Sequence, residues 1–249
     1  MRIDVLTLFP NMFRGPFDES IIKRAVESGV VSIHIHDIRN WAKGRHKVAD
    51  DYPYGGGPGM VLKPEPVFEA TEAVLEMNSE RGPIVLLTPL GRVLDHDLTL
   101  ELVSQQRLVL ICGHYEGIDA RVHERLVTLE LSIGDYVLSG GELPAMVLVD
   151  AVVRHLPGAL GSPDSAGDES FTDGLLEAPP YTRPPDFRGW QVPDILLSGN
   201  HQEVARWRRH RNLVWTAQRR PDLLKKAPLT DEDREWLAAN QVAVKEGDL

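Results

Sequence analysis

Three glycine-rich turns are the segments of this sequence best suited to hold a ligand. They are LLTPLGR at 86–92, LICGHYEGID at 110–119 and SIGDYVLSGGELPA at 132–145. Each lies at or directly after the end of an expected strand, and loops at the carboxyl ends of strands in an open parallel sheet are where ligands bind. Any one of them is read more simply as a tight turn, but the three together favour a shared pocket.

Glycine backbone in these turns can approach a planar ligand closely and adopt positive φ. The residues that allow this are Gly113, Gly117, Gly134, Gly140 and Gly141. Their exposed amides and carbonyls are suited to the edge of an adenine, and Tyr115, Tyr136 and Leu138 would supply apolar walls.

Other catalytic signatures are missing. The run GGGPGM at 55–60 fails the G-x-G-x-x-G pattern because its sixth position is Met60. The sequence has no P-loop lysine pattern, G-x-S-x-G elbow or H-E-x-x-H motif. A single cysteine, Cys112, makes neither an internal disulfide nor a zinc pattern. Dinucleotide-dependent, kinase and serine-hydrolase functions therefore lose their main support.

Charged residues near the middle of the chain allow several interpretations. Asp168, Glu169 and Asp173 stand close together in the segment 165–184, and their spacing alone indicates nothing beyond solvation. Arg154 follows two valines, where an unpaired charge is costly to bury. It would reach water, meet an anion, or interact favourably with the end of its helix.

The elements that must position these residues alternate along the first 160 residues. Apolar runs predict strands at 3–8, 30–35, 84–87, 108–112 and 129–133. Periodic patterns predict helices at 21–27, 67–75, 97–104 and 120–126. This order predicts an α/β fold with a mostly parallel sheet. A further helix at 142–155 is apolar on nearly all sides, which predicts burial or packing against a partner subunit.

Beyond this region the composition changes. Residues 158–185 are rich in Gly, Pro, Ser, Asp and Thr, which indicates a linker or a functional loop. Asn200 with Glu203, and Thr230 with Asp233, resemble the capping boxes that begin helices. We therefore expect a main domain at 1–160, a linker at 161–184 and a small helical domain at 185–249.

Charge and hydropathy limit the partners. A net charge of −10 argues on average against a polyanionic partner. Between 201 and 226, however, a basic cluster faces only Glu203 and Asp222, which remains compatible with nucleic acid. The cluster comprises Arg206, Arg208, Arg209, Arg211, Arg219, Arg220, Lys225 and Lys226. Neither a signal peptide nor a run of about 18 apolar residues is found, so we expect a cytoplasmic protein with no membrane partner.

Five segments together closely resemble the bacterial tRNA (guanine-37 N1)-methyltransferase family, which belongs to the knotted SPOUT class. In chain order they are DYPYGGGPGM at 51–60, GHYEGID at 113–119, SIGDYVLSGGELPAM at 132–146, DGLLEAPPYTRP at 173–184 and VPDILLSGNH at 192–201. The resemblance covers most of the chain, and only the stretch after about Thr230 is undiagnostic.

The resemblance implies a methyltransferase domain with a deep trefoil knot, followed by a small helical domain that binds tRNA at the anticodon stem-loop. Patterning alone would argue against a knot, since knots are rare. The resemblance also implies a homodimer with shared active sites, which fits the apolar helix at 142–155.

The resemblance further implies the site residues. S-adenosylmethionine would be bound by Leu87, Pro89, Gly113, Tyr115, Glu116, Ile133, Gly134, Asp135, Tyr136, Val137, Leu138, Gly140 and Gly141. The substrate side would comprise Asp50, Gly55, Gly59, Ser165, Ser170, Phe171, Asn200 and Arg208.

Catalysis by resemblance involves a carboxylate and an arginine. The family's catalytic aspartate lies two positions before a Phe, where this chain has Glu169. Glutamate keeps the carboxylate but adds a methylene, so Glu169 is the expected base, with Asp168 as the alternative. Arg154 matches the family arginine that supports the guanine. Magnesium is a second implied cofactor, near Glu116 or the linker carboxylates, although no ligand spacing defines a metal site.

Three other functions stay open at this point. They are a ribose 2'-O-methyltransferase of the same knotted class, a non-catalytic RNA-binding module, and a nicotinamide-dependent dehydrogenase that lacks its glycine fingerprint.

Overall fold

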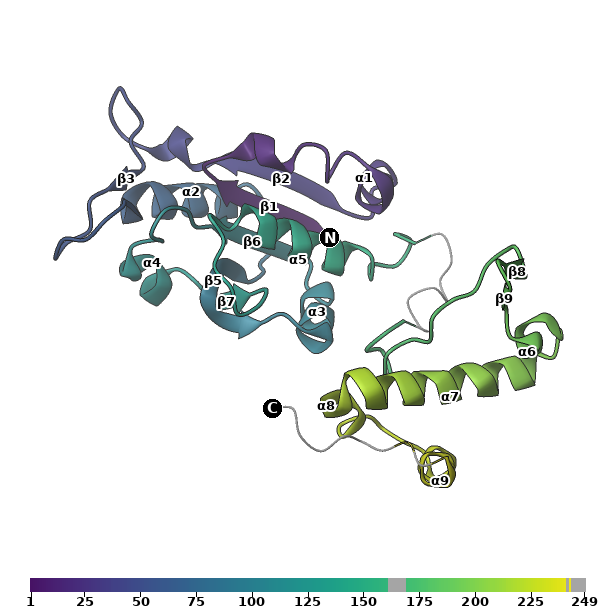
Figure 1. Cartoon of the computed structure of the whole chain (residues 1–249). Coiled ribbons are helices and arrows are strands. Elements are labelled where there is room, and N and C mark those ends of the chain that lie inside the picture. The colour runs from purple at the N-terminus through teal and green to yellow at the C-terminus, as the bar shows by residue number, and fades with distance from the viewer. Residues whose placement is uncertain (161–168, 241, 243–249) are drawn as a thin grey trace. The chain divides into compact units, whose positions relative to one another are not determined.

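A five-stranded parallel sheet forms the centre of the N-terminal part of the chain, with strand order β2-β1-β6-β5-β7 (Figure 1). The strands are β1 (Arg2–Thr7), β2 (Ser32–Asp37), β5 (Ile84–Val93), β6 (Arg107–Cys112) and β7 (Leu129–Ser132). Strands covered on both faces are nearly continuous in apolar residues. The predicted α/β fold with a parallel sheet is therefore confirmed, and every residue of β6 is buried.

Helices cover both faces of this sheet (Figure 1). One core cluster includes residues of α1 (Ser20–Glu27), α3 (His96–Val103) and α5 (Glu142–Val153), and the other includes residues of α2 (Pro64–Glu76) and α4 (Ala120–Arg125). Because side chains of a strand alternate between faces, β6 gives Leu110 to the first cluster and Ile111 to the second. All five helices predicted in this region are confirmed.

β5 does not end at Leu87 as the sequence predicts. Leu87 pairs with Leu131 of β7, the register then shifts, and Arg92 pairs with the same Leu131. The strand thus carries an irregularity where a turn was expected, and Gly91 fits there because a Cβ would lie 2.2 Å from the backbone nitrogen of Leu131. The four residues from Thr88 to Gly91 are thereby pushed out of the ladder.

Short elements complete this part of the chain. They are the 3-10 helices η1 (Pro10–Phe13) and η2 (Ile38–Trp41) and the antiparallel pair β3 (Asp50–Asp51) and β4 (Val61–Leu62). None of them was predicted, since each is too short to show a periodic pattern.

The structure, a computed structural model, describes residues 1–160, 169–240 and 242. The chain divides into two compact units, Met1–Pro163 (unit 1) and Asp164–Leu249 (unit 2). A separate linker between them and the path of a knot stay predictions. Within the described ranges, no helix is both long and apolar enough to span a membrane.

Unit 2 is mostly helical. Its elements are the hairpin β8 (Asp186–Phe187) and β9 (Trp190–Gln191), α6 (Asp194–Leu197), α7 (His201–Arg219), α8 (Pro221–Leu224) and α9 (Asp231–Ala239). Leu175, Leu213 and Leu224 form part of its core. Both predicted helix starts are confirmed, but only Thr230 and Asp233 form a reciprocal capping box, whereas the side chain of Asn200 accepts a single hydrogen bond from a backbone amide.

Candidate active site

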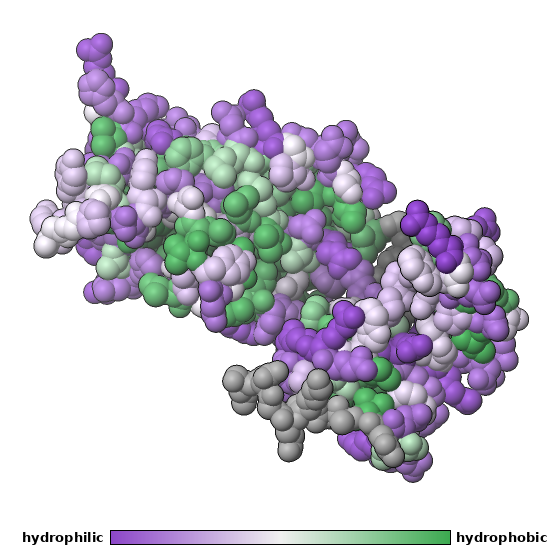
Figure 2. All heavy atoms as spheres, viewed as in Figure 1, coloured by the Kyte–Doolittle hydropathy of each residue, from purple (hydrophilic) through white to green (hydrophobic). Residues whose placement is uncertain are grey.

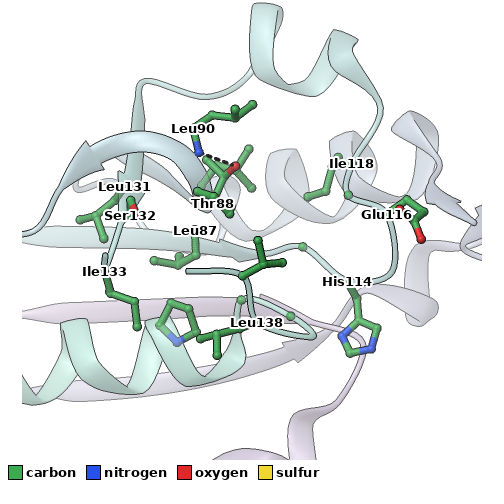
Figure 3. Close-up of a pocket in the computed structure, with 18 of the residues that line it drawn as sticks. Leu87, Thr88, Leu90, His114, Glu116, Ile118, Leu131, Ser132, Ile133 and Leu138 are labelled. Carbon is green, nitrogen blue, oxygen red and sulfur yellow. Dashed lines mark hydrogen bonds between the residues drawn. The ribbon is translucent and has the colours of Figure 1, made fainter. Parts of the chain in front are cut away.

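A cavity of about 680 Å³ lies in unit 1, lined by loops that follow β6 and β7 and by the irregular segment of β5 (Figure 3). This volume is in the usual range for small-molecule sites. The three glycine-rich turns predicted to meet in one pocket all contribute to its lining. Leu87, Ile133 and Leu138 supply apolar walls, and His114 and Glu116 lie toward one end of the view (Figure 3).

Most residues expected to bind the methyl donor line this cavity. They are Leu87, Pro89, Gly113, Tyr115, Glu116, Ile133, Gly134, Tyr136, Val137, Leu138, Gly140 and Gly141. Asp135 is outside the lining set. The structure thus brings residues from three separate turns together around one cavity, while their role toward a donor stays a prediction.

The glycines of these turns meet two different needs. Positive φ, which glycine allows at all five positions, is adopted at Gly117 (124°) and Gly134 (144°). At Gly141 the need is space, since a Cβ would lie 2.7 Å from Cα of Cys112. Its N–H donates to the carbonyl of Gly113 at 2.8 Å. The start of α5 is therefore held directly against the end of β6.

A buried polar cluster behind the cavity was not predicted. Glu142, the first residue of α5, is 1% exposed, and its Oε1 accepts a hydrogen bond from Oγ1 of Thr7 at 2.7 Å. Its Oε2 lies 3.6 Å from Nδ1 of His114, a residue of the cavity lining. A lone acidic residue opening an apolar helix was the available signal, but Thr7 lies 135 residues away in sequence.

Cys112 is not suited to nucleophilic chemistry. Burial first, and then the nearby charge of Glu142, raise the pKa of its thiol well above the usual value. A thiol that stays protonated is a poor nucleophile. The single cysteine is therefore a core residue.

The loop between β3 and β4 lies against the cavity loop. The N–H of Glu116 donates to the carbonyl of Met60 at 3.0 Å. A Cβ on Gly59 would come within 2.5 Å of Cγ of Glu116. The structure thus brings one residue expected on the substrate side, Gly59, into contact with one expected on the donor side. Gly55 is exposed in the same loop, and Asp50 begins it in β3.

The two residues expected in catalysis belong to different units. Arg154 is the C-cap of α5 in unit 1 and is partly buried. A cation there interacts favourably with the helix dipole. Glu169 is partly buried in unit 2, where its carbonyl accepts a hydrogen bond from the N–H of Thr172 at 3.3 Å. Asp168 and Ser165 lie outside the described residues.

The segment that carries Glu169 is tied to α7. Ser170 accepts a hydrogen bond from the N–H of Glu177 through its hydroxyl, and Phe171 donates its N–H to the carbonyl of Leu175 at 2.8 Å. The N–H of Leu176 donates to the hydroxyl of Thr216 in α7. These bonds fold 169–177 into a tight turn on the helix expected to bind tRNA.

The basic residues of α7 are not equivalent. Arg209 forms ion pairs with Asp233 and Asp173, and its hydrogen bonds lower the pKa of Asp233 to about 2. It therefore holds unit 2 together and is not part of a free basic surface. Arg208 is exposed, and the guanidinium of Arg211 lies 5.4 Å from the ring centre of Trp207.

The implied magnesium site finds no support in the side chains. Across residues 1–160, 169–240 and 242, no group of three or more His, Cys, Asp or Glu side chains is placed to hold a metal ion. Glu116 belongs to no such group in that part of the chain, and the linker carboxylate Asp168 lies outside the described residues. No step of the chemistry is therefore assigned to a metal.

Comparisons with known proteins identify the family of this chain. The family described as "tRNA (Guanine-1)-methyltransferase TrmD" matches residues 1–226. A protein of Dehalococcoides mccartyi is 56% identical over 237 residues, covering 95% of this chain and 96% of the relative. A Geobacter sulfurreducens protein is 57% identical over 238 residues, with 96% and 97% covered, and a Geobacillus kaustophilus protein is 57% identical over 237 residues, with 95% and 97% covered. All three are named tRNA (guanine-N(1)-)-methyltransferase.

Proposed function

The chain belongs to the TrmD family of tRNA (guanine-1)-methyltransferases, and from that premise we propose that it methylates N1 of the guanine at position 37 of tRNA with S-adenosylmethionine as the donor. The resemblance read from the five sequence segments and the assignment as a methyltransferase are both confirmed by the comparisons. Since its relatives are named for the N1 atom of guanine, the ribose methyltransferase alternative loses its support.

One observation carries the donor proposal: the cavity of about 680 Å³ to which the three turns contribute. Its glycine backbone leaves polar groups next to apolar walls, a combination that suits an adenine ring with a polar edge. When bound, the donor supplies a methyl group made electrophilic by its sulfonium. The chain's own residues must then orient the guanine and unmask its nitrogen.

Glu169 is the proposed base. Neutral guanine carries a proton on N1, so that nitrogen is a poor nucleophile until the proton leaves. A carboxylate within hydrogen-bond reach accepts this proton, and a positioned base contributes about a hundredfold to ten-thousandfold in rate. The electron pair left on N1 then forms the new bond to carbon. The partly buried turn at 169–177 supports this role because it holds Glu169 on a folded segment.

Arg154 is the proposed electrostatic stabiliser. As the N1 proton leaves, negative charge spreads onto the guanine carbonyl oxygen. A guanidinium donates charge-assisted hydrogen bonds to such an oxygen, and this stabilisation is largest in a site that excludes water. The assignment rests on the resemblance. Because α5 places Arg154 about 18 Å from the helix end that adjoins the cavity, Arg154 would act in a shared site of the proposed dimer.

The tRNA itself would meet unit 2. The exposed Arg208 and Arg211 of α7 are suited to phosphate contacts, which give affinity, whereas the pocket gives base choice. A base in an anticodon loop can be splayed out at modest cost before it reacts. Because tRNA is a cytoplasmic substrate in bacteria, the cytoplasm is the proposed place of action.

A homodimer with shared active sites is the proposed assembly. Figure 2 shows apolar side chains gathered on the visible face of unit 1. On α5, Leu143 is 51% exposed and Val147 is 47% exposed, and the preceding loop adds Val137 and Leu138. Exposed apolar patches of this kind mark an interaction surface, and two of these residues, Val137 and Leu138, line the cavity.

The proposal is tested by methyl transfer to defined RNAs. Purified protein is incubated with labelled S-adenosylmethionine and tRNA transcripts that differ only at position 37 and at its 5' neighbour. Label should enter transcripts with guanine at position 37 and no others. Equal labelling of transcripts without that guanine would overturn the proposed substrate.

A further inference from the structure

A carboxylate is buried behind the donor cavity without a full set of hydrogen bonds. Oε1 of Glu142 accepts from the hydroxyl of Thr7, which in turn accepts from the N–H of Phe9 at 2.8 Å. Oε2 faces Nδ1 of His114 across 3.6 Å, which is longer than a hydrogen bond. Buried carboxylates are costly unless their oxygens are paired, and a hydrogen bond from His114 would pair this second oxygen.

His114 shows the complementary deficit. Among the residues that the structure describes, its Nδ1 is the buried side-chain polar atom left without a hydrogen-bond partner. Its ring packs against two aromatic rings, with its centre 4.5 Å from that of Phe9 and 4.9 Å from that of Tyr115. The imidazole is thus held by packing while the nitrogen facing Glu142 remains unsatisfied.

Gly140 keeps the space between the two groups open. A Cβ at this position would lie 2.3 Å from Oε2 of Glu142 and 2.4 Å from Nδ1 of His114. Gly140 does not need positive φ, so the reason for glycine here is steric. A side chain would stand directly between carboxylate and imidazole.

We propose that Glu142 is a positioning residue: it draws in His114 as the methyl donor fills the cavity, and so fixes the loop Gly113–Ile118 against the donor. A closure of less than 1 Å would convert the 3.6 Å approach into a charge-assisted hydrogen bond. The loop is already joined to the start of α5, because Gly141 donates to Gly113 and Gly140 pairs with His114. The hydrogen bond between the side chains of Glu142 and His114 would add to these backbone contacts between the loop and α5.

This proposal rests on the proposed function, in which S-adenosylmethionine is the donor. Glu142→Gln tests the role of Glu142, because glutamine has nearly the same size and shape as glutamate. Gln keeps an oxygen for Thr7 but removes the carboxylate from His114. Donor affinity measured by calorimetry should fall about tenfold, the effect of losing one such hydrogen bond, while kcat at saturating donor should change much less. Glu72→Gln, an exposed carboxylate of α2, is the matched control and should leave affinity unchanged.

A double-mutant cycle separates positioning from general stability. If Glu142 acts through His114, then Glu142→Gln should have no further effect on donor affinity in a His114→Asn background. Additive losses in the double variant, or unchanged affinity in Glu142→Gln alone, would overturn the proposal. Thermal unfolding of each variant checks that the fold is retained.

A spectroscopic readout keeps the test independent of the proposed function. In protein labelled with 15N-histidine, the Nδ1 resonance of His114, assigned with His114→Asn, should shift to a hydrogen-bonded position when S-adenosylmethionine is added, and should not do so in Glu142→Gln. The same shift in both proteins would refute the pairing. If S-adenosylmethionine does not bind to the wild type at all, the proposed donor is refuted instead. If in that case the Nδ1 resonance is the same in wild type and Glu142→Gln, the pairing of Glu142 with His114 is refuted as well.

Discussion

At the scale of single residues, the chemistry depends on whether a glutamate can serve where the family's aspartate stands. Glu169 precedes Phe171 by two positions, as that aspartate does. Its extra methylene lengthens the reach of the carboxylate, and the bonds that fold 169–177 fix the backbone from which it extends. The carboxylate itself, rather than the length of the side chain, should therefore decide whether turnover occurs.

Glu169→Ala should lower kcat by about a hundredfold to ten-thousandfold, the range for removing a general base. Affinity for S-adenosylmethionine should stay near the wild-type value, because the donor cavity belongs to other segments. Single-turnover rates and calorimetry measure the two quantities. Glu169→Asp should retain more of the wild-type kcat than Glu169→Ala does. Asp168→Ala is the control, and its kcat should stay near the wild-type value. Full turnover in Glu169→Ala with Asp168 intact would show that the base is assigned wrongly.

A second prediction concerns Asp4, which is fully buried in β1. Burial alone would raise the pKa of its carboxyl, but hydrogen bonds from His36, Arg2 and Arg107 hold that pKa well below the usual range. A lowered native pKa means that this stability is present above the unfolded pKa of about 3.9 and is lost as pH falls toward the native value.

Asp4→Asn should therefore lower the free energy of unfolding by roughly 3–5 kcal/mol at pH 7, since it leaves the buried Arg107 without its carboxylate partner. The difference between variant and wild type should narrow below about pH 4. Urea unfolding at several pH values measures it, with Glu101→Gln, which loses an exposed pair with Arg92, as the control expected to change little. A difference independent of pH would contradict the ionised pair.

At the scale of elements, α7 combines two kinds of arginine. Arg209 is held by Asp233 and Asp173 inside unit 2, whereas Arg208 is exposed and Arg211 lies over Trp207. A triple replacement of all three would therefore confuse RNA binding with folding. Replacing Arg208 and Arg211 separately from Arg209 distinguishes tRNA binding from the stability of unit 2.

Arg208→Ala with Arg211→Ala should weaken tRNA binding and reduce the slope of log affinity against log salt by about one unit for each phosphate that the variant no longer neutralises. The melting temperature should hardly change, because neither side chain supports the core of unit 2. Arg209→Ala should lower the melting temperature, because Arg209 holds Asp233 and Asp173 within unit 2. Filter binding over a salt series would contradict the assignment if the double variant bound tRNA with the wild-type slope.

The elements that could be predicted from the sequence are those whose pattern is local. Continuous apolar runs such as 108–112 predicted strands because a doubly covered sheet buries both faces. The continuation of β5 past Leu87 could not be predicted, since TPLG is typical of a turn and only pairing with Leu131 extends the strand. The pair of Glu142 and His114 was missed for the same reason, because its partners come together only in the fold.

At the scale of the whole molecule, the structure of a single chain does not explain why α5 exposes apolar side chains. The sequence predicted that this helix is buried or packs against a partner, and the structure shows seven of its residues buried while Leu143 and Val147 remain exposed. The knot and the dimer could not be read from periodicity, because chain threading and assembly leave no local pattern.

Leu143→Asp with Val147→Asp should convert the proposed dimer to a monomer, since a charged pair in an apolar interface is costly to desolvate. Methyl transfer should fall with it if the active sites are shared. Light scattering coupled to gel filtration measures the mass, and Met77→Asp, at an exposed apolar position at the end of α2, is the control. A double variant that stays dimeric would contradict the proposed interface, and a monomeric one with full activity would contradict the shared site.

The most direct test of the account is the chemical identity of the product. A tRNA transcript with guanine at position 37 is incubated with the protein and S-adenosylmethionine, digested to nucleosides and analysed by mass spectrometry against standards. We predict 1-methylguanosine, formed at position 37 and lost with Glu169→Ala. A ribose-methylated nucleoside, or a methyl group on another atom of the base, would contradict the account.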